Sequence, residues 1–298
     1  MPWSSNGSEV MNAKQRFAIC PRGDWRKTAF GAKIDYPNDT WDIALTYLRL
    51  GEDFDPAMGF VPRKGIHKLS GGANLRHYTE SVSWLRYAYY ELMPTVVWNL
   101  KGEWESYRLF TAPINWQMES GDRIEVNANP EGEQLVEPFE ISDGVVIDPG
   151  AYHFVRYRLE WAMATKRPVS GQLTWWFGDF YDGTLDQIQA RVQIRPSELV
   201  IFDLSATRNI GDMKAGEFDQ QVYGLRAMAN FSPDLQLTSF VQYDDESEEV
   251  GTNTRLRWTF SPLGELFLVY NYNVVDRLDR WAMEASQFMV KVQYAVRW

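Results

Sequence analysis

The feature that most constrains the fold is a strict alternation of apolar and polar side chains along most of the chain. In residues 185–195, isoleucine, alanine and valine side chains fall on one face, while glutamine and arginine side chains fall on the other. A period of two residues is typical of a β-strand, in which successive side chains point to opposite faces of the sheet. The chain is therefore predicted to be nearly all β. The same period recurs at 30–36, 41–47, 155–161 and 255–260.

Alternating segments and turn residues together predict about fifteen antiparallel strands in up-and-down order. Prolines in the turns recur at a fairly regular spacing, which indicates a repeat of hairpins. Residues 1–24 are weakly patterned, so residues 25–298 are expected to hold the whole sheet. The proline turns are centred on Pro168, Pro196, Pro233 and Pro262. The expected strands are 28–36, 40–50, 67–78, 94–100, 103–118, 122–129, 151–165, 170–178, 184–195, 198–208, 218–231, 235–244, 252–261, 264–274 and 286–298.

Two architectures would satisfy this pattern. A closed barrel of this many strands encloses a lumen too wide for side chains to fill, so its polar face would point inward and its apolar face would meet lipid. A soluble sandwich would instead bury the apolar faces against each other. The odd strand count differs from the even numbers of most bacterial barrels. We favour an antiparallel up-and-down transmembrane β-barrel, of which this chain supplies a part.

The C-terminal residues favour the membrane architecture. Apolar or aromatic side chains occupy every second position up to the last residue, which resembles the final strand by which outer-membrane barrels are recognised for assembly. Aromatic residues make up 15% of the chain, and outer-membrane barrels carry aromatic girdles at both membrane interfaces. The predicted assembly signal consists of Phe288, Val290, Val292, Tyr294, Val296 and Trp298.

Composition excludes several other classes. The chain carries 40 acidic and 30 basic residues, and this net charge of −10 argues against nucleic acid as a partner. Cys20 is the only cysteine, which excludes an intrachain disulfide. No run of apolar residues is long enough for a transmembrane helix. The first residues lack a secretory signal, so an outer-membrane location requires that the chain be a truncated portion of a longer protein.

Several segments are more specific than the alternation. Residues 51–63, Gly-Glu-Asp-Phe-Asp-Pro-Ala-Met-Gly-Phe-Val-Pro-Arg, resemble a loop pattern of domain-of-unknown-function family 5916. Five further segments resemble that family in the same order along the chain. They are 135–141, 147–152, 178–183, 253–258 and 265–271.

The resemblance implies a C-terminal outer-membrane barrel from a Gram-negative bacterium. In that family the barrel follows a domain similar to carbohydrate-binding modules of family nine, which implies a link to glycans. The expected partners are outer-membrane lipid, the barrel-assembly machinery and a small solute or glycan. The expected function is a pore, transport or binding protein, without a cofactor, a metal or catalytic residues.

Charged residues of the polar face are the candidate binding residues. The loop at 51–63 carries acidic and basic side chains that could narrow a pore, or it could form a rigid external cap stiffened by its prolines. Arginines on the polar faces of later strands could form a basic ladder along a lumen. The loop candidates are Glu52, Asp53, Asp55 and Arg63, and the ladder candidates are Arg156, Arg158, Arg191, Arg255 and Arg257.

Two other functions stay open. A membrane-associated hydrolase acting on carbohydrate would use Asp179, Asp182 and Glu52, although Asp179 and Asp182 suit turn capping better. A soluble structural β-protein is the other alternative. The acidic run 244–249 lacks the pattern of a calcium loop and is expected to be a solvated loop. The three histidines, His67, His77 and His153, lack the close spacing of metal ligands.

Overall fold

The computed structural model describes residues 24–56, 59–277 and 280–296. Most of these residues lie in β-strands, and the one helix among them is the short 3-10 helix η1 (Trp25–Lys27). No helix in these ranges is long and apolar enough to cross a membrane.

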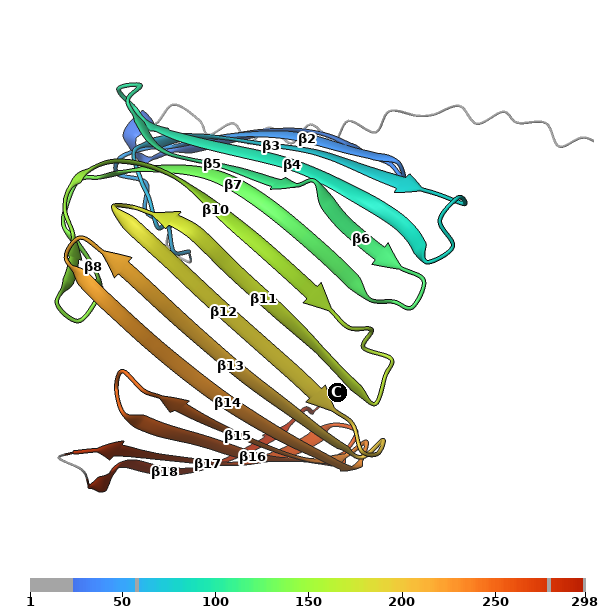
Figure 1. Cartoon of the computed structure of the whole chain (residues 1–298). Helices are drawn as coiled ribbons and strands as arrows, with labels where there is room; N and C mark the ends of the chain where they lie inside the picture. Colours follow the sequence, from blue (N-terminus) through green and yellow to red (C-terminus); the bar gives the residue numbers. More distant parts are fainter. Residues whose placement is uncertain (1–23, 57–58, 278–279, 297–298) are drawn as a thin grey trace, which may run out of the picture. The chain divides into compact units, whose positions relative to one another are not determined.

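Sixteen of the described strands form one antiparallel sheet (Figure 1). The order along the sheet is the chain order from β1 to β18, except that β6 pairs with β4 and β7, and that β8 and β9 form a separate hairpin. This up-and-down order confirms the predicted all-β antiparallel fold class. The first strands are β1 (Ala29–Pro37), β2 (Trp41–Leu50), β3 (Ile66–Tyr78), β4 (Leu85–Asn99), β5 (Trp104–Ala112), β6 (Ile114–Met118), β7 (Arg123–Leu135), β8 (Phe139–Ser142) and β9 (Val145–Ile147). The others are β10 (Gly150–Ala162), β11 (Val169–Phe180), β12 (Gly183–Ile194), β13 (Val200–Met213), β14 (Gly216–Ser232), β15 (Leu235–Asp244), β16 (Glu249–Ser261), β17 (Gly264–Asp276) and β18 (Trp281–Tyr294).

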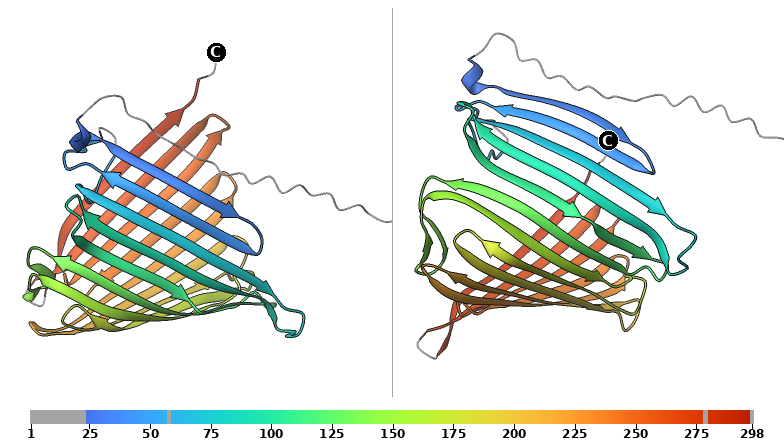
Figure 2. Two further views of the ribbon diagram at one scale, coloured as in Figure 1. Left: turned by 90° about the horizontal axis from the view of Figure 1, so that it is seen from above. Right: turned by 45° about the horizontal axis from the view of Figure 1, so that its top comes forward.

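The chain divides into two compact units. Among the described residues, unit 1 comprises 24–117, 126–139 and 147–157, and unit 2 comprises 118–125, 140–146 and 158–296. Within each unit, strands that are neighbours in this order along the sheet lie side by side (Figure 2). The units are described separately below.

In unit 1 the structure extends one expected strand. The strand predicted at 94–100 begins at Leu85 instead. Its first half carries aromatic side chains on both faces, which hides the alternation. Tyr87 and Tyr89 lie on one face, where the guanidinium group of Arg76 lies 5.4 and 5.6 Å from their ring centres, and Tyr90 lies on the other.

A second difference in unit 1 concerns the expected strand 103–118, which is divided at Pro113 into β5 and β6. Near this break, buried asparagine side chains of β7 take the place of backbone hydrogen bonds between β5 and β7. Asn127 donates a 3.0 Å hydrogen bond to the carbonyl of Thr111, and the Thr111 amide donates a 3.1 Å bond to Asn129 Oδ1. These side chains satisfy backbone groups where the strands separate. Strand β7 continues to Leu135 rather than ending at 129, because its residues 131–133 pair with residues 106–108 of β5.

In unit 2 the unexpected element is the short strand β8, whose residues 140–142 belong to this unit together with Val145. Val145, Leu185 and Met213 form a small buried cluster against which Ile141 and Phe218 pack. The proline turns predicted at 168, 196, 233 and 262 all lie at one end of the unit 2 strands, since each follows a strand of the same direction. The hairpin prediction is thereby confirmed.

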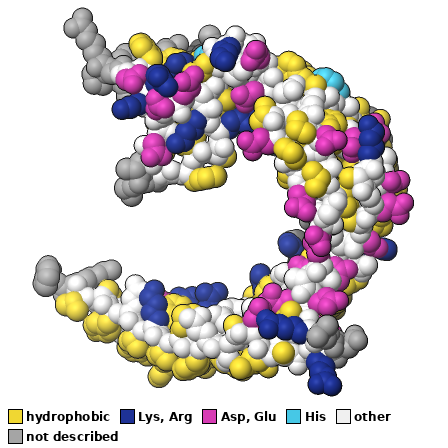
Figure 3. Space-filling view, turned by 90° about the vertical axis from the view of Figure 1, so that its left-hand side faces the viewer, with side chains coloured by type: hydrophobic (Ala, Val, Ile, Leu, Met, Phe, Trp, Pro, Cys, Tyr) yellow, Lys and Arg dark blue, Asp and Glu magenta, His cyan; other side chains and the backbone are white. Residues whose placement is uncertain are grey.

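The two faces of the unit 2 sheet differ sharply. Cross-strand partners place Leu237, Leu256, Leu268 and Val290 in one row across β15 to β18, because residues opposite one another share a face. The neighbouring row contains Gln236, Arg257, Phe267 and Lys291 and lies on the opposite face. Figure 3 shows hydrophobic side chains gathered on one face of the C-terminal strands and lysine and arginine side chains on the other.

Aromatic side chains mark both ends of the apolar face. Tyr243 lies opposite Val250, and Trp258 lies opposite Leu235. Residues 250 and 258 of β16 are about 26 Å apart along the strand. For a strand tilted by about 40° from a barrel axis, this separation is roughly 20 Å along the axis. No residue within 24–56, 59–277 or 280–296 covers this face, since Ile188, Val192 and Trp258 are 38%, 40% and 47% exposed. Other exposed aromatics on this face include Trp161, Trp175, Tyr223, Tyr270 and Trp281.

Candidate functional site on the polar face

On the polar face of unit 2, residues that lie opposite one another on neighbouring strands form a continuous row across eight strands, β11 to β18. The row contains three small residues, Gly224, Gly251 and Ala285, among longer polar side chains. Its members in strand order are Gln172, Arg191, Ser205, Gly224, Gln242, Gly251, Asn273 and Ala285.

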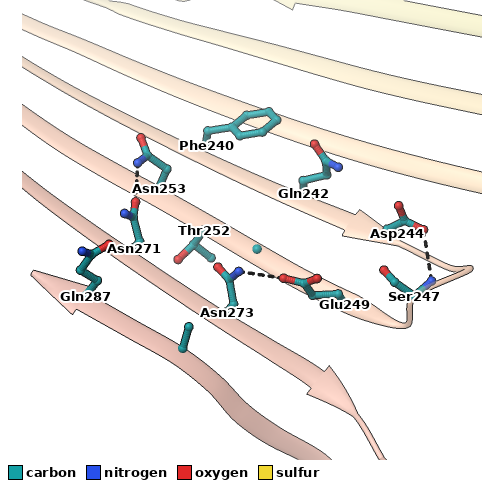
Figure 4. Close-up of a pocket in the computed structure, with 12 residues that line it drawn as sticks. Phe240, Gln242, Asp244, Ser247, Glu249, Thr252, Asn253, Asn271, Asn273 and Gln287 are labelled. Carbon is teal, nitrogen blue, oxygen red and sulfur yellow. Dashed lines mark hydrogen bonds between the residues drawn. The ribbon is translucent and has the colours of Figure 1, made fainter.

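A hollow of about 490 Å³ lies over this row where it crosses β15 to β18 (Figure 4). Gly251 leaves room at its floor, because a Cβ atom there would meet only Asn273 Oδ1, at 3.6 Å. The walls carry five carboxamide groups, and Phe240 stands at one side (Figure 4). The carboxamides belong to Gln242, Asn253, Asn271, Asn273 and Gln287.

Hydrogen bonds fix part of this wall. Asn253 donates to Asn271 at 2.5 Å, and Asn273 donates to Glu249 at 2.8 Å. The carboxamides of Gln242 and Gln287 make no hydrogen bond to the described residues. The hollow therefore combines a fixed wall of donors and acceptors with two side chains whose hydrogen-bonding capacity is unused.

The acidic loop beside the hollow is held by hydrogen bonds. Asp244 accepts from the backbone amide of Glu246 at 3.0 Å, and Asp245 accepts from that of Gln221 at 2.5 Å. The Glu246 side chain accepts from Ser142 and from Gln220. Several of its carboxylates thus act as caps, as is common for aspartate in turns.

Three of the predicted ladder arginines lie on this polar face. Arg191 is exposed beside Gln189 and Thr207. Arg255 and Arg257 line a second hollow of about 350 Å³, next to Glu265. Arg257 donates to Glu265 from Nε at 3.1 Å and from a terminal nitrogen at 2.5 Å.

The other two ladder arginines are enclosed. Arg158 pairs with Glu125 and Glu160, and its guanidinium lies 5.3 Å from the Trp176 ring centre. Arg123 also pairs with both carboxylates, which are 3% and 5% exposed. Arg156, in unit 1, is 4% exposed. The enclosed arginines are committed to packing and ion pairs rather than presented to solvent.

The candidate loop residues of unit 1 are paired with basic or acidic neighbours. Arg26 contacts Glu52 at 3.3 Å and Asp53 at 3.1 Å, and Lys64 contacts Asp55 at 3.3 Å. Residues 57 and 58 of the loop lie outside the described residues.

At the end of the same loop, Arg63 joins two strands. It contacts Glu105 of β5 at 3.5 Å and Glu133 of β7 at 3.3 Å, and it donates to Ser106 at 3.0 Å. The end of the loop is therefore anchored to the sheet, while its place relative to a lumen stays a prediction.

Of the suspected hydrolase residues, Asp179 and Asp182 lie beside or in a turn, and Glu52 lies in an ion pair. Asp179 is exposed in β11, and Asp182 lies in the two-residue turn before β12, where the preceding Tyr181 has a φ of 49°. Glu52 is held by Arg26. Across the described ranges, no group of three or more histidine, cysteine, aspartate or glutamate side chains could hold a metal ion.

The described part of the predicted assembly signal lies in β18, whose side chains are exposed throughout. Phe288 lies opposite Tyr270 and Val290 opposite Leu268, so both share the apolar face. Val296 is described and exposed, whereas Trp298 and the first 23 residues, including Cys20, lie outside the described residues. The role of this strand as a signal stays a prediction.

No family model matches this chain, and no curated protein matches it. The resemblance to domain-of-unknown-function family 5916 therefore stays a prediction from the motifs.

Sequence reasoning missed the carboxamide hollow. The alternation had assigned Gln and Asn residues to the polar face, but it gave no reason to group Gln242, Asn253 and Asn271. These residues come from three strands, and only the register of those strands places them together. The class that the fold and this site define is an up-and-down antiparallel β-sheet protein with one uncovered apolar face and one hollowed polar face.

Proposed function

We propose that this protein is a bacterial outer-membrane β-barrel protein that binds or passes small solutes along its polar face. The observation that carries the proposal is the uncovered apolar face of unit 2 with aromatic side chains at both of its ends. In water such a surface would be a strong aggregation hazard, whereas in a bilayer it is the surface that meets hydrocarbon.

The dimensions and chemistry of the sheet agree with this proposal. Strands β10 to β14 contain 12 to 17 residues each, enough for the 9–11 tilted residues that a membrane crossing needs. The opposite face carries arginines, carboxamides and hollows, as expected of a wall beside water. The motif resemblance points to a glycan as the solute.

Spin labels on neighbouring residues test the proposal directly. Cys20→Ser removes the native thiol, and Ile188→Cys or Gln187→Cys then places one label on the apolar or the polar face of β12. The proteins are refolded into phosphatidylcholine vesicles, and collision rates with oxygen and with a water-soluble nickel complex are measured. Because oxygen concentrates in lipid, we expect high oxygen access at 188 and high nickel access at 187.

The alternatives predict different results. A soluble protein would remain monodisperse without detergent, and neither label would report contact with lipid. A label at 188 shielded from both reagents would mean that the apolar face packs against protein, as in a sandwich, and would overturn the proposal.

A further inference from the structure

We infer that the hollow over β15 to β18 is a binding subsite for a neutral, polyhydroxylated solute of the size of a monosaccharide or disaccharide. This inference rests on the proposed function only in requiring that the polar face meets water. All residues that line the hollow belong to unit 2, and all except Ser247, which lies in the turn between β15 and β16, belong to the consecutively paired strands β15 to β18. The subsite is therefore built on a regular part of the sheet.

The chemistry of the walls selects the class of solute. A carboxamide offers two donor hydrogens and an acceptor oxygen, so neighbouring carboxamides match hydroxyl groups, which both donate and accept. The hollow presents five such groups. The pair Asn253 and Asn271 satisfies only one donor and one acceptor of the two side chains, which leaves the remaining groups available for a ligand.

The charge of the hollow disfavours anions. Asp244 and Glu249 are cross-strand partners at one end, where they would repel an anion. The Asp244 side chain accepts a hydrogen bond from the Glu246 amide, and the Glu249 side chain accepts one from Asn273. Among the described residues, neither carboxylate belongs to a group of acidic residues or histidines that could hold a metal ion. A neutral solute avoids the desolvation cost of a charge and can still donate hydroxyl hydrogens to these oxygens.

Size and shape support the same class. A volume of about 490 Å³ falls within the usual range for small-molecule sites, and the open floor comes from Gly251. Phe240 supplies an apolar wall. One side of its ring is covered by the guanidinium of Arg226, at 5.3 Å from the ring centre, which holds the ring in place. An apolar wall beside hydrogen-bonding groups suits a sugar, whose ring carries both C–H and O–H groups.

The test measures binding to the full chain refolded in a detergent that has no sugar headgroup. Glucose, maltose and sucrose are the neutral probes, with gluconate as the anionic and choline as the cationic control. By calorimetry or equilibrium dialysis we expect millimolar binding of at least one neutral sugar and weaker binding of both ions. Failure of all three neutral sugars to bind, or equal binding of gluconate, would overturn the inference.

Matched variants locate the site. Gly251→Phe should fill the hollow and weaken sugar binding by about tenfold or more. Gly72→Phe, on the polar face of β3 where a Cβ atom meets nothing within 4 Å, should leave binding unchanged. Undiminished binding by a folded Gly251→Phe protein would place the sugar elsewhere and contradict the inference.

A second variant covers the case in which Gly251→Phe does not fold. Gln242→Leu with Gln287→Leu keeps the size of two exposed side chains and removes their hydrogen bonds, so binding should fall about tenfold. Unchanged binding by this variant would also overturn the inference. If the labels at 187 and 188 differ in oxygen and nickel access as expected but no sugar binds, only this inference is contradicted. If a sugar binds but the labels do not differ, only the membrane proposal is contradicted.

Discussion

Arg167 donates two hydrogen bonds to Asp122, at 2.7 and 2.9 Å, and so joins the loop after β10 to the turn before β7. The same carboxylate accepts a 2.8 Å bond from the backbone amide of Ala164. These bonds, first those from Arg167, lower the pKa of Asp122 from its usual 3.8 to about 2. Both residues lie outside the strands.

Asp122→Asn should therefore reduce stability in a pH-dependent way. A carboxyl group whose pKa is lowered by folding stabilises the protein above its unfolded pKa, and that contribution disappears as the pH falls from about 4 towards 2. We expect the variant to lose about 1 kcal/mol at pH 7 because the contact is partly solvated, and to differ little from the wild type near pH 2.

Urea unfolding in detergent micelles at pH 7, 4 and 2.5 measures this effect. Asp234→Asn is the control, since Asp234 lies in a turn at the same end of unit 2 and its side chain forms no ion pair with the described residues. A constant difference between wild type and Asp122→Asn at all three pH values would show that the carboxylate charge is not responsible.

Arginine substitutions at neighbouring positions of β12 should have opposite consequences. Val192 lies on the apolar face, and Gln193, on the polar face, donates a 2.8 Å hydrogen bond to Asp203. Val192→Arg would place a charge in hydrocarbon and should cost about 2–4 kcal/mol if it lies near the bilayer centre. Gln193→Arg retains a partner in Asp203 and should change stability by about 0.5 kcal/mol or less.

The measurement is the free energy of unfolding from phosphatidylcholine vesicles. Equal losses for the two variants would mean that the two faces meet similar surroundings.

Side-chain alternation predicted most of this fold because a strand with one apolar and one polar face repeats a simple period. The strand over residues 184–195 was predicted almost at its observed bounds, since its isoleucines and glutamines alternate without interruption. The beginning of β4 was missed because Tyr87, Tyr89 and Tyr90 lie on both faces. Alternation assigns a face to an aromatic residue only where its neighbours differ from it in polarity.

The candidate site was less predictable than the strands. Sequence identified charged residues on the polar face but could not show which of them are enclosed. Arg158 and Arg191 occupy equivalent positions in the alternation, yet Arg158 lies between Glu125 and Glu160 while Arg191 is exposed. The difference depends on which strands pair and in which register, and that register is a property of the folded sheet.

Asn129 should be important for stability although it lies far from the hollow in sequence. It is 1% exposed, and its Oδ1 atom accepts the hydrogen bond of the Thr111 amide where β5 and β7 separate. Asn129→Ala would leave that amide buried without its partner, at a cost of about 1–3 kcal/mol. Asn209→Ala, which loses a 3.3 Å contact with Gln187, should cost less. Equal unfolding free energies for the two variants in micelles would contradict this role.

The last prediction concerns the final strand as an assembly signal. Phe288 faces the same side as Tyr270, whereas the adjacent Gln287 lies opposite Asn271 on the polar face. Phe288→Asp interrupts the apolar row, so it should lower the amount of folded protein in the outer membrane when the chain, fused to an export signal, is produced in a Gram-negative host. Gln287→Asp introduces the same charge on the other face and should assemble nearly as well as the wild type. Heat-dependent electrophoretic mobility of the membrane fraction distinguishes folded from unfolded chains, and equal assembly of both variants would show that the apolar row of β18 is not recognised.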